Sequence, residues 1–168
     1  MIPQIGIESA PADLATWSLV SFVRQKLSVG VREVVFTIQN AHMSASGGTL
    51  LTVLSAGEKY SMKPIRESMT AYALSPVPGP KIKRPKTFAE KVFGIRAVPD
   101  LGTVGIALAA NTDRSQVHRS WGILGGGAMY GSKFAFNEYM KYRNAFMAAA
   151  ARFALIFAIV AISVPPIR

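Results

Sequence analysis

The strongest constraint on folding is an apolar run near the C-terminus. Residues 145–164 carry a single charge, at Arg152, and two prolines follow at Pro165 and Pro166. A membrane-spanning helix needs about 20 mostly apolar residues, whereas a run of about 10–14 is more typical of a core or interfacial helix. A charge near the middle of a crossing costs about 2.5–3.5 kcal/mol on insertion scales. The run therefore favours shallow membrane insertion over a full span.

Basic and aromatic residues precede the apolar run. Such a collar is typical of a helix that attaches to a membrane interface, and the alternative is an amphipathic core helix with snorkelling lysines. We expect one helix from Phe136 onward, so that residues 136–168 form a hydrophobic, membrane-associated helix. The residues expected to contact lipid are Lys133, Tyr139, Lys141, Tyr142, Arg143, Phe153, Ile156, Phe157, Ile159 and Val160.

The whole chain is basic and unusually apolar. Its 168 residues include 19 basic and 9 acidic side chains, for a net charge of +10, and the mean hydropathy is +0.28. Such a charge suggests an anionic partner. Because no zinc-finger or RNA-recognition pattern is present, we expect membrane lipid and other protein subunits as partners, and no nucleic acid. Cysteine is absent and the two histidines lack metal-ligand spacing, so we expect no metal.

The first part of the chain predicts alternating strands and helices. Ser9 can cap a helix that ends at about Leu27, and residues 31–39 alternate as a strand does. Two further helices are expected, one starting at Ser46 and one over residues 64–73. Residues 1–75 therefore form a strand–helix–strand–helix part of an α/β fold, with α+β as the alternative.

The second part is harder to interpret. Residues 76–99 are rich in proline and lysine and predict a surface loop. Residues 100–135 complete the domain, with residues 102–113 either a strand or a buried turn of helix and residues 115–124 helical. The glycines from Gly125 to Gly127 do not follow a hydrophobic strand, so a loop hinge is favoured over a dinucleotide-binding turn.

Two short stretches could carry chemistry. Glycines at a helix start allow close approach of an anion or a polarised carbonyl to free backbone N–H groups, and the alternative is a tight, packed turn. A histidine beside an arginine could supply a proton donor and an anion clamp, and the alternative is a surface or packing residue. The candidate residues facing a substrate or anion are Ser46, Gly47, Gly48, Thr49, His118 and Arg119. No catalytic residue is assigned.

Several stretches, in order along the chain, resemble the saccharopine dehydrogenase-like oxidoreductases, which include trans-acting enoyl reductases of lipid biosynthesis. The resembling stretches are IPQIGIESAPADLATW, SASGGTLLTVL, AYALSP, VHRSWGIL and YGSKFAFNEYMKYRN with the apolar run after it. The resemblance spans roughly residues 2–168 and implies the middle-to-late, substrate-side portion of such a protein. The family's Rossmann domain, which binds NADP, would precede Met1, so we expect no cofactor in this chain unless that domain is supplied elsewhere.

Three functions remain open at this point. The chain could be a non-catalytic, membrane-attached accessory subunit derived from the family, and this is the one we favour. It could instead be part of an NADP-dependent, enoyl reductase-like oxidoreductase of lipid metabolism, or a lipid-binding module. For the first function we expect the mitochondrial inner membrane as the location, with the lipid droplet as the alternative.

Overall fold

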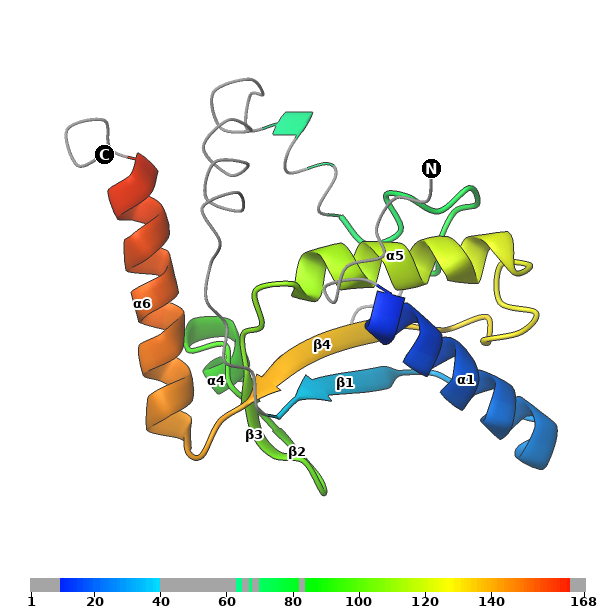
Figure 1. Ribbon diagram of the computed structural model, residues 1–168, viewed down its shortest axis with the longest axis horizontal. Coiled ribbons are helices and arrows are strands. Elements are labelled where there is room, and N and C mark those ends of the chain that lie inside the picture. Colours follow the sequence, from blue (N-terminus) through cyan, green and yellow to red (C-terminus); the bar gives the residue numbers. More distant parts are fainter. Residues whose placement is uncertain (1–9, 40–62, 65–66, 68–69, 82–83, 164–168) are drawn as a thin grey trace. The chain divides into compact units, whose positions relative to one another are not determined.

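The computed structural model describes residues 10–39, 63–64, 67, 70–81 and 84–163. The fold is mixed α/β, with four strands in the order β1-β4-β3-β2 (Figure 1). The chain divides into two compact units. The first draws on Met1–Phe36, Glu67–Pro85 and Ala107–Tyr139, and the second on Thr37–Arg66, Lys86–Ile106 and Met140–Arg168.

Helix α1, Ala10–Leu27, opens the described part of the first unit. Asp13 lies in its first turn and Arg24 and Lys26 in its last, so the side-chain charges complement the helix dipole. The helix ends at Ser28, which is left-handed at a φ of 55° and whose N–H donates to Arg24. The predicted end of this helix is confirmed; its predicted cap, Ser9, lies outside the described residues.

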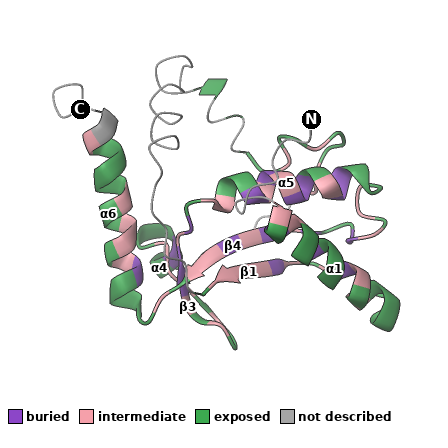
Figure 2. Cartoon of the chain, in the orientation of Figure 1, coloured by how far each residue is buried: buried purple, intermediate pink, exposed green. Residues whose placement is uncertain are grey.

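Only a narrow stripe of α1 is buried. Ala12, Thr16 and Val20, spaced four residues apart, face inward where α1 packs against α5, while much of the remaining surface is exposed (Figure 2). An amphipathic surface helix usually turns polar residues outward. Here Leu14 and Trp17 are among the exposed side chains.

Strand β1 spans Val34–Ile38 and strand β4 spans Phe136–Lys141, and the two are neighbours in the sheet. The first part of each strand belongs to the first unit. Ala135 donates to Arg32 O and accepts from Val34 N–H, which is the pattern of a parallel pair. Helix α5, Ala110–Ile123, supplies Val117 and Trp121 to the core. The predicted strand at residues 31–39 and helix at residues 115–124 are both confirmed.

The core of the first unit is mainly apolar and aromatic. The buried members of its cluster are Ala12, Val20, Val34, Val117, Trp121, Tyr130, Phe134 and Phe136.

The glycine loop ends helix α5. Gly125, Gly126 and Gly127 all have positive φ, and Gly126 N–H donates to Trp121 O. Phosphate-binding loops precede a helix and present its N-terminal N–H groups. This loop follows a helix instead, as expected for a hinge rather than a dinucleotide-binding turn.

In the second unit, residues predicted as loop form regular structure. Helix α4, Phe88–Val92, is capped by Thr87, whose side chain accepts from Glu90 N–H. Strand β2, Arg96–Val98, then pairs antiparallel with β3, Gly102–Gly105. The loop predicted at residues 76–99 is therefore wrong over its second half, because the cap and the hairpin turn outweigh the low local hydropathy.

The apolar run forms helix α6, Ala145–Ser163, which packs against β3. The predicted helix from Phe136 is wrong at its start, because Phe136–Lys141 is strand β4. Lys141 of β4 pairs antiparallel with Val104. Asn144 separates the two elements, since its side chain accepts from Met147 N–H as a helix N-cap does.

The helix predicted over residues 64–73 lies partly outside the described residues. Of the described residues, 63–64 and 67 are helical, as predicted. Residues 70–75 instead form tight turns, with backbone hydrogen bonds from Thr70 to Glu67, Ala73 to Thr70 and Ser75 to Tyr72. The helix predicted from Ser46 lies outside the described residues entirely.

Candidate functional site

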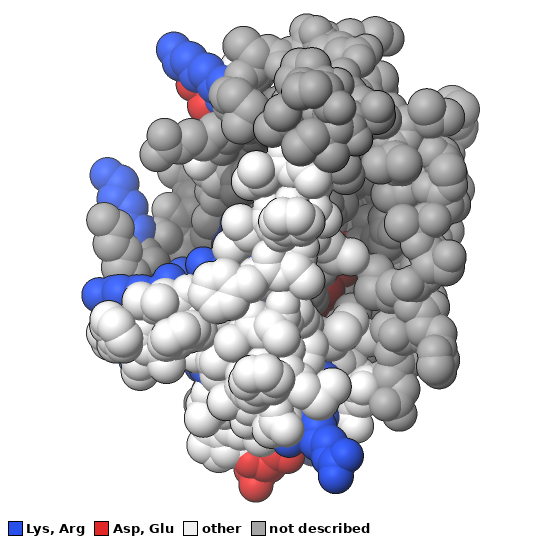
Figure 3. All heavy atoms as spheres, turned by 90° about the vertical axis from the view of Figure 1, so that its left-hand side faces the viewer, with Lys and Arg blue, Asp and Glu red and all other residues white. Residues whose placement is uncertain are grey.

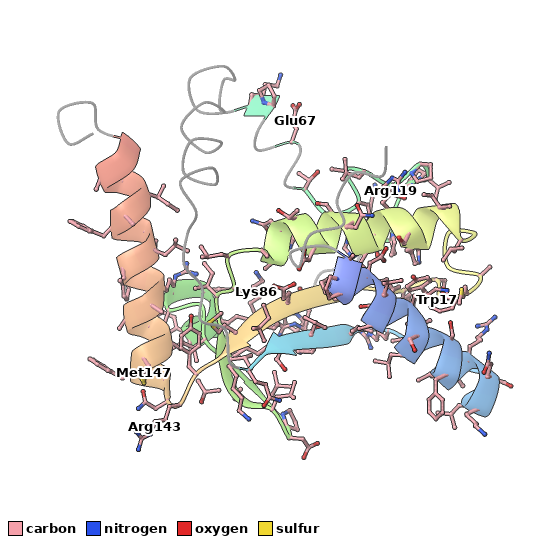
Figure 4. All side chains as sticks on the ribbon, viewed as in Figure 1. Trp17, Glu67, Lys86, Arg119, Arg143 and Met147 are labelled. Atoms are coloured by element: carbon pink, nitrogen blue, oxygen red, sulfur yellow. The ribbon has the colours of Figure 1, made fainter. Side chains whose placement is uncertain are left out.

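Of the two stretches predicted to carry chemistry, only one can be located. Residues 46–49 lie outside the described part of the chain. His118 and Arg119 are neighbours on α5, but His118 is 2% exposed. Arg119, which is labelled in Figure 4, is exposed. The structure therefore does not bring them together as a proton donor and anion clamp.

The surroundings of His118 make it a packing residue. Its Nε2 accepts the backbone N–H of Phe136 at 3.3 Å, so the ring proton resides on Nδ1. Burial, together with the charge of Arg114, lowers the pKa of His118 to about 3. The neutral imidazole stacks on Tyr72 with ring centroids 3.8 Å apart. At neutral pH this ring has no proton to donate as an imidazolium.

A cavity of about 300 Å³ lies in the first unit between α1, α5 and the loop that follows α5. This volume is at the lower end of small-molecule sites. The lining residues are Asp13, Leu14, Trp17, Ser120, Leu124 and Tyr130. None of them was among the predicted site residues.

Two of the lining residues have buried polar atoms with unused hydrogen-bonding capacity. Asp13 Oδ2 accepts from the Ser120 hydroxyl at 2.6 Å, but Oδ1 is buried and has no partner among the described residues. The Tyr130 hydroxyl is likewise buried and without a partner in the described part of the chain, and the residue is 0% exposed. Buried polar atoms are normally hydrogen-bonded, so such exceptions call for an explanation.

Both groups have shifted pKa values. Burial raises the pKa of Asp13, while the Ser120 hydrogen bond and the charge of Arg119 act in the opposite direction. Burial and the nearby Asp13 carboxylate raise the pKa of Tyr130 to about 12. The phenol is therefore protonated at neutral pH.

The second unit offers a different kind of surface, along α6. Its buried side is narrow and includes Ala148, 1% exposed, whereas Phe146 and Phe157 are 81% and 75% exposed. Figure 3 views the face that carries α6, and most of its described atoms belong to uncharged residues. We define the α6 outer face as the exposed residues Ala145, Phe146, Met147, Ala150, Phe153, Ala154, Ile156, Phe157, Ala158, Ile159 and Val160.

Arg152 is the one charged residue of α6, and it is not part of this outer face. A Cβ built on Gly94 would lie 2.6 Å from Arg152 Nη1, so the guanidinium covers the turn that follows α4. Arg152 Nε is buried and has no hydrogen-bond partner among the described residues. The outer face consequently carries no charge along residues 145–160.

Only some of the basic and aromatic residues that precede α6 are exposed. Lys141 and Arg143 are exposed and lie just before α6, with Arg143 and Met147 marked in Figure 4. Tyr142 packs its ring over Gly105 and donates its hydroxyl to Ile106 O at 3.1 Å. Tyr142 therefore takes part in the packing of the second unit.

Two more predicted lipid contacts belong to the first unit. Lys133 is exposed and Tyr139 is partly buried on β4. The predicted lipid-contacting residues on α6 are Phe153, Ile156, Phe157, Ile159 and Val160, all exposed on its outer face.

Sequence reasoning missed the buried carboxylates. Glu138 on β4 is 4% exposed, and neither of its carboxylate oxygens has a hydrogen-bond partner among the described residues. Its alternation with Phe136 was the available signal, because residues two apart on a strand share a face.

Three further findings bear on function. Among the residues that the structure describes, no group of three or more acidic or histidine side chains could hold a metal ion. No helix in the described part of the chain combines the length and the apolar character that crossing a membrane requires. Comparison of the chain with protein-family models, with curated proteins and with solved structures found no match.

Proposed function

We propose that this protein is a non-catalytic accessory subunit that attaches to a membrane surface through the α6 outer face. The observation that carries the proposal is the exposure of this uncharged, apolar face, with Arg152 turned beneath the helix. Contiguous exposed apolar patches on this scale mark interaction sites in soluble proteins. The occupant we propose is the interfacial region of a lipid bilayer.

The way α6 is held favours attachment in the plane of the membrane. Its inner stripe packs against β3, so only the outer face is available to lipid. Interfacial helices bury an apolar face about 5–10 Å deep, at the boundary between headgroups and acyl chains. Burying one phenylalanine side chain is worth about 1.5–3 kcal/mol. Phe146, Phe153 and Phe157 together supply enough apolar surface for a measurable affinity.

Charge favours lipid over a protein partner. The chain has a net charge of +10, and Lys141 and Arg143 are exposed immediately before α6. Basic residues near an apolar helix are attracted to anionic headgroups, at about 1 kcal/mol each. An apolar protein groove would gain nothing from these charges.

The ancestry of the proposed subunit rests on its resemblance to the saccharopine dehydrogenase-like oxidoreductases. We infer that the chain corresponds to the substrate-side portion of that family and serves within a larger assembly at the mitochondrial inner membrane. Tight NADPH binding by the purified chain, measured by nucleotide fluorescence, would argue for the redox alternative. Recovery of the native protein in a lipid-droplet fraction would contradict the mitochondrial location.

The membrane proposal is tested by co-sedimentation with vesicles of phosphatidylcholine and phosphatidylserine. We expect Phe157→Ser to weaken binding by about tenfold or more, because it removes one buried phenylalanine from the interface. Phe88→Ser is the matched control, because Phe88 lies on α4 and is also 75% exposed. It should leave vesicle binding unchanged.

Two results would contradict the proposal. One is vesicle binding that Phe88→Ser and Phe157→Ser reduce equally. The other is vesicle binding that survives Phe157→Ser while a co-purifying protein is lost, which would assign the α6 outer face to a protein partner.

A further inference from the structure

The cavity between α1 and α5 presents two kinds of accessible group. Part of its lining is apolar and open to solvent, since Leu14, Trp17 and Leu124 are 64%, 46% and 40% exposed. Arg119 is exposed and lies nearby, because its positive charge acts on the Asp13 carboxyl that also lines the cavity. Accessible apolar surface and a cation therefore occur together at this place.

A second cation continues the same side of α1. Arg24 is exposed and follows Trp17 by seven residues, or about two helical turns, so the two side chains project from one side of the helix. Lys26, nine residues after Trp17, projects from the opposite side of the same helix. Figure 4 marks Trp17 on α1 and Arg119 on α5, the two helices that flank the cavity.

The exposed charges of the first unit are mostly positive. Asp113 and Glu138 are buried, and of the described acidic residues in this unit only Glu67 is exposed. The exposed basic residues described in the same unit are Arg24, Lys26, Arg32, Lys81, Arg119 and Lys133. An acidic partner is complementary to such a surface, whereas a second copy of this chain would bring like charges together.

We propose that the cavity and its flanking cations dock an acidic segment of another protein. One large apolar side chain of the segment enters the cavity against Leu14, Trp17 and Leu124, and its carboxylates face Arg24 and Arg119. Tryptophan and arginine are among the residue types that most often dominate binding at protein interfaces. The site lies in the first unit and goes beyond the proposed membrane attachment, which it does not require.

The surface of α1 favours a protein over a bilayer. A cavity of about 300 Å³ suits a single anchoring side chain, and such anchors seated in pockets are typical of protein interfaces. Exposed Ser18 and Gln25 follow Leu14 by four and eleven residues, so polar and apolar groups are mixed on this side of α1. Protein interfaces combine an apolar centre with a polar rim in this way. The α6 outer face, by contrast, is apolar throughout.

The probe is a phage-displayed library of random peptides, selected on the immobilised full-length protein in buffer without vesicles. We expect enrichment of peptides that combine one large apolar residue with several aspartates or glutamates. The most enriched peptide is then synthesised, and its affinity is measured by fluorescence anisotropy. Raising KCl from about 0.1 M to about 1 M should weaken its binding by about threefold or more, because exposed ion pairs are screened by salt.

Two matched pairs of variants locate the binding. Trp17→Ser should weaken the peptide's affinity by about tenfold or more, whereas Phe22→Ser should not, because Phe22 is 58% exposed on α1 but does not line the cavity. Arg24→Glu should weaken it by about threefold or more. Lys26→Glu makes the same change of charge in the same last turn, on the opposite side of α1, and should not.

Two further measurements keep the test specific. A peptide whose acidic residues are replaced by lysine should bind Arg24→Glu more tightly than it binds the native protein, because the sign of the contact is reversed. Leu14→Ser repeats the apolar test if the urea midpoint shows that Trp17→Ser is poorly folded.

Three results would overturn the proposal. One is a selection that enriches no peptide or enriches basic ones. Another is an equal loss of affinity within either matched pair of variants. The third is a loss of vesicle binding in Trp17→Ser as large as that in Phe157→Ser, which would assign this surface to the bilayer instead.

Discussion

The imidazole of His118 lies between the ring of Tyr72 and the start of β4, with each neighbour making a specific contact. Tyr72 stacks on its face, and Phe134 meets it edge-on at 6.2 Å between ring centroids. Tyr72 also donates its hydroxyl to Phe134 O, so the three side chains form one packed group. Protonating the imidazole would place an uncompensated charge in that group, which explains why its pKa is depressed.

We expect His118 to make the stability of the protein depend on pH. Its pKa falls from 6.5 to about 3 on folding, so below pH 6.5 the unfolded chain binds a proton that the folded chain does not. The free energy of unfolding should therefore decrease as pH falls from about 6.5 towards 3, by up to about 1.4 kcal/mol per pH unit. Urea unfolding at a series of pH values measures this slope.

The control for this prediction is His118→Phe, which keeps an aromatic ring in the stack. It should cost about 1–3 kcal/mol at pH 7, because the buried Phe136 N–H loses its acceptor. Its stability should fall less steeply below pH 6.5 than that of the native protein. Parallel curves for the two proteins would show that His118 is not buried in its neutral form.

At the scale of elements, the packing of α6 depends on contacts with the turn between α4 and β2. Gly94 in that turn has a φ of 68°, and the Arg152 guanidinium lies directly over it. Phe93, just before the turn, meets Phe153 of α6 edge-on at 6.3 Å between ring centroids. These contacts, together with Ala148 against Gly105, hold α6 against the rest of the second unit, and Phe153 keeps half of its surface exposed.

We expect Gly94→Ala to destabilise the second unit more than Gly102→Ala does. Both glycines have positive φ, so each substitution costs about 1 kcal/mol for the left-handed backbone. Gly102 has no atom within 4 Å of a built Cβ, whereas at Gly94 the Cβ would meet Arg152. Because these atoms belong to the outer part of a flexible arginine, which can shift, the additional cost should lie at the low end of the overpacking range, about 1 kcal/mol. Thermal unfolding of both variants measures the difference, and equal destabilisation would contradict the position assigned to Arg152.

At the scale of the whole molecule, the proposed membrane attachment would draw separately on the net charge of +10 and on the apolar outer face of α6. Charge acts over the screening length of the solution, which shrinks from about 10 Å at 0.1 M salt to about 3 Å at 1 M. Apolar burial does not weaken with salt in this way. The two contributions can therefore be resolved by ionic strength.

We expect binding to phosphatidylserine-containing vesicles to weaken by at least about tenfold between 0.1 M and 1 M KCl, because screening removes the attraction of several basic residues. Binding to vesicles of phosphatidylcholine alone should be weaker and should change little with salt. Co-sedimentation at a series of salt concentrations measures both. If binding to the anionic vesicles is insensitive to salt, the net charge has no part in attachment.

The sequence by itself determined the elements that local periodicity specifies. Val34, Phe36 and Ile38 alternate in β1, because residues two apart on a strand share one face. The helical pattern placed the end of α1 at Leu27 but not its buried stripe, since Leu19 and Leu27 are 50% and 65% exposed. The start of α6 was missed although Asn144 marks it, since the alternation in Phe136, Glu138 and Met140 runs straight into an apolar helix. The apolar character of residues 145–164 required no structure to recognise.

Only the tertiary structure decided which way the functional side chains face. Nothing local to His118 predicts that it is buried beneath Tyr72, because the two residues are far apart in sequence and meet only by packing. Asp13 and Ser120 are 107 residues apart, yet their hydrogen bond is a wall of the cavity. In the sequence, Arg152 interrupts the apolar run, but in the structure its guanidinium lies over Gly94. Periodicity assigns a residue to a face of its element, but long-range packing decides what that face meets.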